Sequence, residues 1–332
     1  MESDNTMASL GEMKDKGYIP QTLQVKLMLG GAISLTKTII TTRPKDFRRL
    51  RTTGSSDEQY IRPPRAYTIP KYKEGMKFCD SEEKYLRPTL FCNHKAPEVV
   101  ALANQLGAFK KSDYEFAKSA FHFVKEKMPL EILPFNPVEE TFTRGTGTCF
   151  HLITCFIALC RAAGIKARYK VFAMNMIQAW YDGMAAADPL VKKWYDSMGY
   201  FMLEGEGEAY IDGKWVVAHV GPKAERQAAA GIPITTFGED SLGNWFTMVP
   251  GTLMRMESIS YGLGGATKIL ERIAPGSMER VNSGIQKQIA MGAKIIKDAG
   301  GLEAYDRQAR MKKGPEGPEV KLKTKKEIVF ED

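Results

Sequence analysis

Apolar residues recur at helical spacing in three stretches of the middle of the chain. The first covers residues 96–106, and the second covers 112–124, where Ser112 precedes the apolar positions as an N-cap. A loop of glycine and threonine at 144–148 leads into the third, 149–162, which is apolar almost throughout. These stretches predict three helices, the last of them buried on most of its surface.

Strand patterns follow the last of these helices. Residues 165–172 predict a strand, and two further runs, 206–211 and 214–220, alternate apolar and polar residues. Asp212-Gly213 separates these two runs, and Asp-Gly is a strong signal for a two-residue hairpin turn. The pattern therefore predicts an α+β fold in which the third helix packs on an antiparallel sheet.

The regions outside this core differ from it in composition and in the pattern of apolar residues. Residues 20–40 predict a helix weakened by Gly30-Gly31, and 52–75 are rich in proline, serine and glycine, which favours an extended segment. Glycine interrupts the helical pattern of 254–299. The predicted organisation has four parts: an N-terminal extension, helical and then extended (1–75), a core (76–250), a C-terminal helical extension (251–305) and a charged tail (306–332).

Charge and cysteine content narrow the classes of function. The 332-residue chain has a formal net charge of +8, and 43–51 is a basic run, which is more typical of a solvated helix face than of nucleic-acid binding. The five cysteines form no Cys-x-x-Cys pair, which argues against a zinc site or a disulfide framework. We expect no metal and no cofactor.

Two features bear on location. The N-terminus is polar and acidic rather than a signal peptide, and residues 24–42 contain lysines, glycines and threonines that make a transmembrane span too polar. We therefore expect a cytoplasmic protein without a transmembrane span. Nothing in the sequence specifies an oligomeric state.

Cys149 stands where the glycine-threonine loop becomes a helix. Unpaired N–H groups and the partial positive charge of a helix N-terminus favour thiolate over thiol, which would make Cys149 a nucleophile. The alternative is a small buried hydrophobe, the usual role of a free cysteine.

A cysteine nucleophile normally needs a general base, and the sequence offers four histidines. His151 is two positions after Cys149 and faces away from it, His122 borders an apolar helix face, and nothing near His94 holds it in place. His219 lies on the second hairpin strand, where a sheet could direct it at the helix start. It is the preferred base.

The hairpin register indicates which carboxylate would orient His219. If Asp212-Gly213 is a two-residue loop, the numbers of paired residues sum to 425, as in Ile211 with Lys214. Glu206 then faces His219 directly, and Glu204 is diagonal to it. A carboxylate beside a histidine orients the ring and raises its pKa. The alternative is that these glutamates form the solvent face of the sheet.

The motifs around these residues resemble the transglutaminase-like superfamily, in the papain-like class of cysteine enzymes. One motif is a G-x-C helix start followed by R-A-x-G-I-x-A-R, and the other is a hairpin of the form E-x-Y-x-x-G-x-W. The run F-x-x-D-S-L at 237–242 is similar to a cytoplasmic bacterial and archaeal branch of the superfamily. The matching residues are Gly147, Cys149, Arg161, Ala162, Gly164, Ile165, Ala167 and Arg168 in the first motif, and Glu208, Tyr210, Gly213 and Trp215 in the second.

The resemblance implies a catalytic histidine and an orienting aspartate, and both positions differ here. Glu204 occupies the position of the family's histidine, and His219 occupies the position of its aspartate. A rearranged set of Cys149, His219 and Glu204 or Glu206 remains geometrically possible.

Two functions are compatible with this set. The first is cysteine-dependent acyl transfer or amide hydrolysis through a thioester, acting on a protein or peptide. The second is a catalytically inactive member that uses the same cleft, with the basic N-terminal segment, to bind a protein partner.

Overall fold

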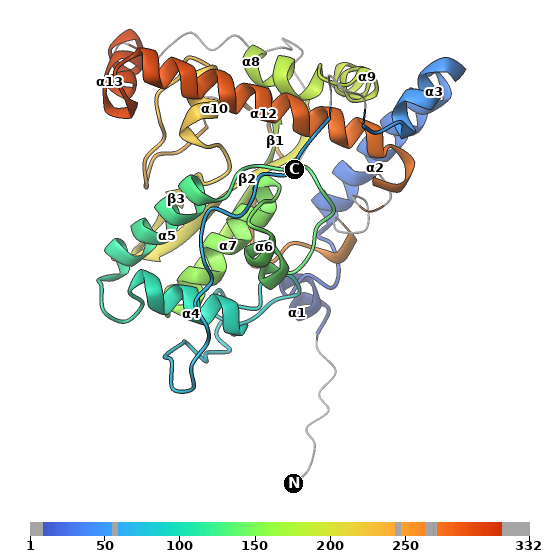
Figure 1. Cartoon of the computed structure of the whole chain (residues 1–332). Coiled ribbons are helices and arrows are strands. Elements are labelled where there is room, and N and C mark those ends of the chain that lie inside the picture. The colour runs from blue at the N-terminus through green and yellow to red at the C-terminus, as the bar shows by residue number, and fades with distance from the viewer. Residues whose placement is uncertain (1–8, 55–58, 243–246, 263–267, 269–270, 314–332) are drawn as a thin grey trace.

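The computed structural model of the protein describes residues 9–54, 59–242, 247–262, 268 and 271–313. Its centre is α7 (Cys149–Ala162), surrounded by α4 (Pro97–Leu106), α5 (Asp113–Lys127) and α6 (Val138–Arg144). Figure 1 shows α7 behind this group, against the sheet. The predicted helices at 96–106, 112–124 and 149–162 are confirmed, and Ser112 caps α5 together with Glu115.

The sheet is antiparallel, with the strand order β3-β2-β1-β4 and β5 paired with β1. The predicted strand and hairpin are present, and a mixed helical and antiparallel architecture confirms the α+β fold. The strand bounds are β1 (Ala167–Asn175), β2 (Phe201–Ile211), β3 (Lys214–Ala218), β4 (Thr247–Met248) and β5 (Met254–Met256).

Two glycines on β2 let α7 approach the sheet closely. A methyl group added at Gly207 would lie 2.6 Å from Phe156, and one at Gly205 would lie 3.3 Å from Phe150. Alternate residues of a strand point to opposite faces, so Glu206 and Glu208, which pair with basic residues of β1, point to the other face of β2.

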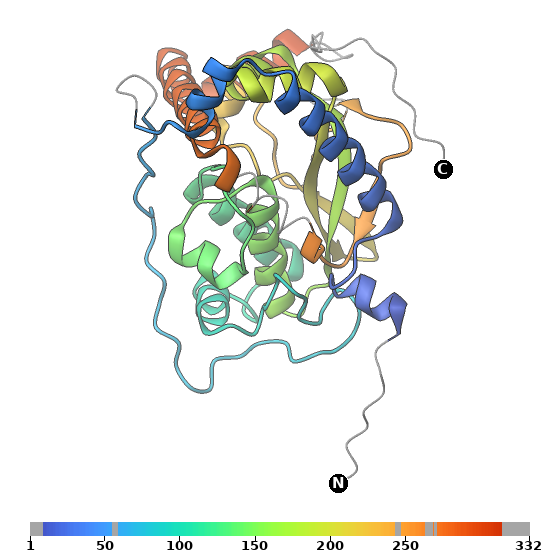
Figure 2. The same ribbon diagram turned by 90° about the vertical axis from the view of Figure 1, so that its right-hand side faces the viewer.

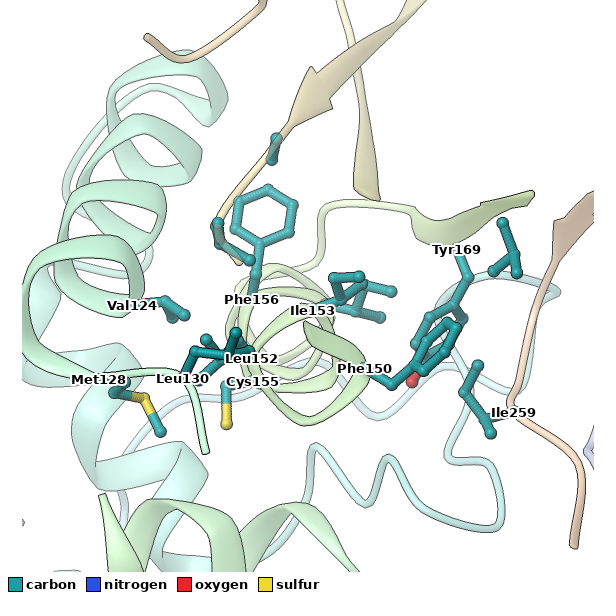
Figure 3. Close-up of a cluster of buried hydrophobic side chains, with 14 of the residues drawn as sticks. Val124, Met128, Leu130, Phe150, Leu152, Ile153, Cys155, Phe156, Tyr169 and Ile259 are labelled. Carbon is teal, nitrogen blue, oxygen red and sulfur yellow. The ribbon is translucent and has the colours of Figure 1, made fainter. Parts of the chain in front are cut away.

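The core surrounds α7 on all sides, as its apolar sequence predicts. In Figure 3 the helix is seen nearly end-on, with Phe150 and Ile153 directed towards Tyr169 of β1. Leu152 is directed towards the side of α5. Because this helix is buried on every side, its first residue is held in one place.

Helices outside the core come from both ends of the chain. Before the core lie α1 (Leu10–Asp15), α2 (Thr22–Ile40) and α3 (Pro44–Arg51). In Figure 2, α2 runs along the side of the sheet away from the α4–α7 group. The later helical elements are α8 (Gln178–Trp180), the π-helical turn η1 (Tyr181–Ala185), α9 (Pro189–Met198), α10 (Ala224–Ala229), α12 (Pro275–Asp298) and α13 (Leu302–Lys313).

Two points in these outer regions differ from the predictions: residues 254–256 form strand β5 rather than the start of a helical stretch, and glycine interrupts neither α2 nor α12. α2 is continuous through Gly30-Gly31, because one side of it packs on α9 and the sheet. α12 is likewise continuous through its glycines, where neighbouring backbone approaches closely, as Glu225 O does at Gly292. The predicted charged tail begins within α13, and its residues 314–332 lie outside the described part of the chain.

Candidate active site

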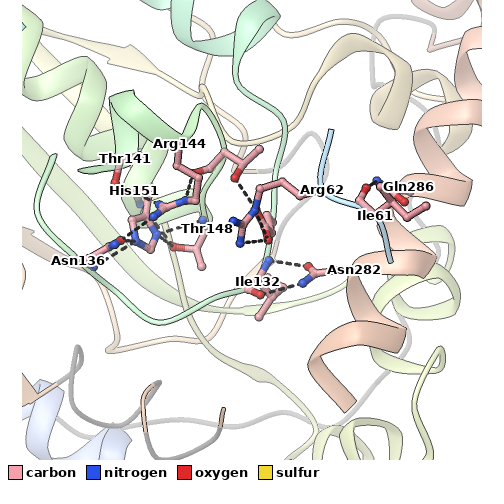
Figure 4. A network of polar contacts seen from close by, with 12 residues as sticks. Ile61, Arg62, Ile132, Asn136, Thr141, Arg144, Thr148, His151, Asn282 and Gln286 are labelled. Carbon is pink, nitrogen blue, oxygen red and sulfur yellow. Dashed lines mark hydrogen bonds and ion pairs between the residues drawn. The ribbon is translucent and has the colours of Figure 1, made fainter. Parts of the chain in front are cut away.

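The loop before Cys149 is held by a network of polar side chains, shown in Figure 4. Thr148 Oγ1 accepts from the backbone N–H of His151, and His151 Nδ1 accepts from the backbone N–H of Thr148 at 3.1 Å. This is a capping box in which histidine takes the place of the usual glutamate. Gly147 is required here, since a Cβ atom at that position would lie 2.3 Å from His151 Cβ.

The same network makes His151 a structural residue. Its Nε2 contacts the side chain and the backbone N–H of Asn136, and Arg144 donates to Asn136 Oδ1 at 3.2 Å. Burial and then the Arg144 charge hold the pKa of His151 well below its ordinary value, so its ring is neutral. Its role is to fix the start of α7.

Cys149 lies at that start, partly buried against the core. The Cys149 thiol lies close enough to the Glu204 carboxyl group and to the backbone N–H of Phe150 for both to shift its pKa. Gly221 passes close by, so that a Cβ atom there would lie 3.5 Å from Cys149 Cβ. The thiol therefore sits between the helix end, β2 and the segment after β3.

The expectation of a lowered thiol pKa is wrong. Burial raises the pKa of Cys149 well above its ordinary value, and the negative charge of Glu204 raises it further. The Phe150 N–H acts in the opposite direction, as a helix N-terminus should, but its effect is smaller. The residue is a protonated thiol with a proton acceptor beside it.

Glu204 is that acceptor. It is buried, and its Oε1 also accepts from the backbone N–H of Gly205 at 3.1 Å. Burial raises the pKa of Glu204 to about 7, against the opposing effects of the Gly205 N–H, the Cys149 thiol and Arg226. A carboxyl group with this pKa exchanges protons near neutral pH.

Arg226 of α10 completes this group, and the sequence pattern did not reveal it. Its guanidinium stacks on Trp180 at 4.0 Å, and its Nε and Nη2 donate to Gln288 Oε1 at 3.3 and 3.2 Å. Its Nη1 has no hydrogen-bond partner among the described residues. Burial lowers the pKa of Arg226 to about 10, while the charges of Glu204 and Cys149 raise it. Arg226 is thus a buried cation beside the thiol and the carboxylate.

The predicted hairpin register is confirmed as far as Ala218, but the expected pair of Glu206 with His219 lies beyond the observed ladder. Ile211 pairs with Lys214, and the ladder continues to Gly207 with Ala218, so that each pair sums to 425. β3 ends at Ala218, and His219 follows immediately after the strand. The register brings Glu206 to the end of this ladder.

Glu206 and Glu208 bind basic residues of β1. Glu206 pairs with Lys170 at 2.9 Å and accepts from the backbone N–H of Ser241 at 2.8 Å, whereas Glu208 pairs with Arg168 at 2.6 Å. Both glutamates are buried, as is Glu204, so the alternative of a solvent face is wrong. Burial raises the pKa of Glu206, and Lys170 opposes this.

His219 is fully buried among cations. Burial, and then the charges of Lys125, Lys170 and Arg226, hold the pKa of His219 well below its ordinary value. Its carbonyl accepts from Lys125 Nζ at 3.4 Å, and Pro222 O accepts from the same atom at 2.8 Å. Burial lowers the pKa of Lys125 to about 7. Lys125 therefore positions the backbone on both sides of Gly221.

One sequence signal could have revealed Lys125. It lies four positions after Phe121, on the apolar face of α5, where a lysine is out of place unless it has buried acceptors.

The outcome for the other histidines also differs from expectation. His94 Nε2 is held by Cys79 O at 2.9 Å, and His122 is an exposed partner of Glu126.

The motif residues around the site have structural roles. Arg161 is buried and donates to the backbone carbonyls of Arg87, Ala167 and Glu257, which joins the end of α7 to the sheet. Arg168 stacks on Trp215 at 3.8 Å while it pairs with Glu208. These contacts explain why the two motifs occur together.

Residues 100–219 match the family model of the transglutaminase-like superfamily. The core of this chain is transglutaminase-like. The match begins in α4 and ends at His219, so it contains Cys149 and Glu204 but not Arg226.

Part of this core is also similar to one solved structure, "The Crystal Structure of a Putative Cysteine Protease from Cytophaga hutchinsonii". The identity is 19%, the TM-score is 0.31, and the similarity covers 41% of this chain and 40% of the other. A likeness this low supports no argument about the reaction. No curated protein matches the sequence.

Proposed function

We propose that the transglutaminase-like core is a thiol enzyme for amide hydrolysis or acyl transfer, with Glu204 as the base. The observation that supports this most directly is that the Cys149 thiol neighbours, and shifts the pKa of, a buried carboxyl group whose pKa is about 7. A base within hydrogen-bond reach of its proton, with a pKa near neutral, meets the requirements of general-base catalysis.

The reaction would proceed through a thioester. Cys149 Sγ forms a bond to the carbonyl carbon of an amide while its proton moves to Glu204, and the C–N bond then breaks as Glu204 returns the proton to the leaving amine. Water or a second amine attacks the thioester, again with proton transfer through Glu204, which restores the thiol. Arg226 would supply positive charge to the tetrahedral oxyanion.

Protein or peptide amides are the proposed substrates, and a reducing cytoplasmic compartment is the proposed setting, where all five cysteines stay free.

The alternative base from the sequence is His219, oriented by Glu204 or Glu206. Its burial among Lys125, Lys170 and Arg226 lowers its pKa and makes it a weak proton acceptor, which supports Glu204 instead. Two substitutions separate the assignments. If Glu204 is the base, Glu204→Gln slows acylation of Cys149 about 100-fold or more, whereas His219→Asn retains most of the acylation rate of the unaltered protein.

The test of the proposal is acylation by a simple ester such as p-nitrophenyl acetate. We expect one acetyl group on Cys149, located by peptide mass spectrometry, and its release on standing. Cys79 is the matched control, since it is the other partly exposed cysteine. Cys149→Ser should abolish the adduct, whereas Cys79→Ser should not. Equal or absent labelling of the two cysteines would contradict the proposal.

A second candidate function is a non-catalytic binding subunit. The raised pKa of Cys149 and the glutamate at the family's histidine position favour it. In that case the cleft and the basic segment 43–51 bind a protein partner, and Cys149 remains unacylated in the same experiment.

A further inference from the structure

Helix α2 presents an apolar stripe to solvent. Val25, Leu29, Ile33 and Ile40 lie on one side of the helix at helical spacing, and Leu29, Ile33 and Ile40 are 58%, 69% and 76% exposed. α2 contains no aspartate or glutamate, and its lysines, Lys26 and Lys37, are both exposed. An exposed apolar stripe flanked by lysines is typical of a helix that lies in a membrane interface.

The opposite side of α2 is attached to the protein, so the stripe has a fixed direction. Leu27 is fully buried, Gly31 O accepts from Trp194 Nε1 at 3.1 Å, and Thr41 O accepts from Lys193 Nζ at 2.8 Å. Among the residues that the structure describes, α2 alone is long and apolar enough to cross a membrane. Its contacts with α9 hold it along the surface of the protein instead.

The stripe ends at a cluster of basic residues. The apolar side of α2 is open to solvent from Leu29 through Ile33 and Ile40 to Thr41. Thr41 also lines a pocket of about 210 Å³, to which four basic side chains and one carboxylate contribute. The charged residues of that pocket are Arg43, Arg49, Lys193, Arg280 and Asp188.

Positive charge continues along α3 beyond this pocket. Arg48 and Arg51 are exposed on that helix, which follows α2 after a short turn. Figure 1 shows α2 and α3 projecting together at one edge of the molecule. The apolar stripe and the basic cluster therefore form one continuous surface, and it carries an excess of positive charge.

We propose that this surface docks the protein on an anionic phospholipid bilayer. The α2 stripe inserts at the boundary between headgroups and acyl chains, α3 contacts the negative surface, and the basic pocket receives a lipid phosphate. A lipid surface fits better than a protein partner because it supplies both apolar contact and negative charge along the whole length of the two helices.

The test is sedimentation of the full-length protein with vesicles. We expect binding to phosphatidylserine–phosphatidylcholine vesicles, little binding to pure phosphatidylcholine, and weaker binding as the salt concentration is raised to about 0.5 M. Ile33→Glu should reduce binding about tenfold or more by placing a carboxylate in the stripe. Arg48→Gln with Arg51→Gln should reduce it by about fivefold per arginine.

Matched controls come from the other end of the molecule. Met311→Glu replaces an exposed apolar residue of α13, and Lys294→Gln with Lys297→Gln removes two exposed lysines of α12. These variants should bind vesicles as the unaltered protein does. Acylation of Cys149, measured without vesicles, should be the same in every variant, which keeps this proposal distinct from the proposed function.

Three results would overturn the proposal. One is no sedimentation with either vesicle type, and another is binding that Ile33→Glu leaves unchanged. The third is a concentration-dependent dimer in solution that Ile33→Glu dissociates, because the stripe would then be an interface between two copies of the chain.

Discussion

At the scale of single residues, the site depends on three charged or titratable groups that burial forces to interact. The Cys149 thiol, the Glu204 carboxyl and the Arg226 guanidinium influence one another's pKa values. Burial disfavours the charged form of each group. The opposite charges of Glu204 and Arg226 partly offset that cost for each other, whereas the Glu204 charge raises the pKa of Cys149 further. The result is a carboxyl group that can accept and return a proton at neutral pH.

The pKa of Glu204 predicts a pH-dependent stability. Its pKa is about 7 in the folded state and 4.5 ordinarily, so the folded state binds the proton more tightly. The stability that Glu204 contributes is fully present below pH 4.5 and is lost as the pH rises to 7. The free energy of unfolding, relative to Glu204→Gln, should therefore fall by about 3 kcal/mol over that range.

Urea denaturation at several pH values measures this difference. Glu303→Gln, on the exposed side of α13, controls for the loss of a glutamate at the surface. If the free energy of unfolding changes with pH in the same way in the unaltered protein and in Glu204→Gln, the carboxyl group does not hold a proton in the folded state.

At the scale of elements, the position of Cys149 follows from the packing of α7 on β2. Gly205 and Gly207 remove side chains from the face of β2 that α7 covers, and the capping box of Thr148 and His151 fixes where the helix starts. The helix can approach no closer or farther without either a clash or a void in the core.

Gly207→Ala should destabilise the protein by about 1–3 kcal/mol, because the added methyl group meets the buried Phe156 ring at 2.6 Å. The measurement is the midpoint of urea denaturation at constant slope. Gly11→Ala in α1 is the control, since the nearest atom to its new methyl group is Ser9 Oγ at 3.8 Å, and it should cause no loss. Equal effects of the two substitutions would argue against close packing of α7 on β2.

At the scale of the whole molecule, α12 connects the outer regions to the core. It packs on α3 at one end and on α13 at the other, with α10 and η1 between them. Gln288 of α12 holds Arg226, and Asn282 bonds both backbone groups of Ile132. The C-terminal extension therefore contributes to the site by positioning Arg226.

The buried ion pair between Arg280 of α12 and Asp188 predicts how much this connection stabilises the fold. Their atoms lie 2.7 Å apart, and both side chains are almost fully buried. Arg280→Met leaves the carboxylate without its cation and should cost about 3–5 kcal/mol in thermal or urea unfolding. Lys192→Met breaks an exposed pair with Asp196 and should cost less than about 1 kcal/mol. Similar losses in both variants would mean that the α12 contact is not a buried one.

The hairpin and the helix that begins at Cys149 could be predicted because their signals are local. Asp212-Gly213 sets the register by turn geometry alone, and the period of the apolar residues sets the helix. The continuity of α2 through Gly30-Gly31 could not be predicted, because contacts with α9 offset the low helix propensity of glycine.

The amino-acid sequence by itself determined the α+β core, the place of Cys149 at a helix start, and the hairpin that carries Glu204 and His219. Only the tertiary structure decided the chemistry around the thiol. It buried Glu204 against Cys149, brought Arg226 from a helix outside the matched core, and surrounded His219 with cations. The reason is physical: a pKa depends on burial and on charges from distant parts of the chain, and neither is a property of local sequence.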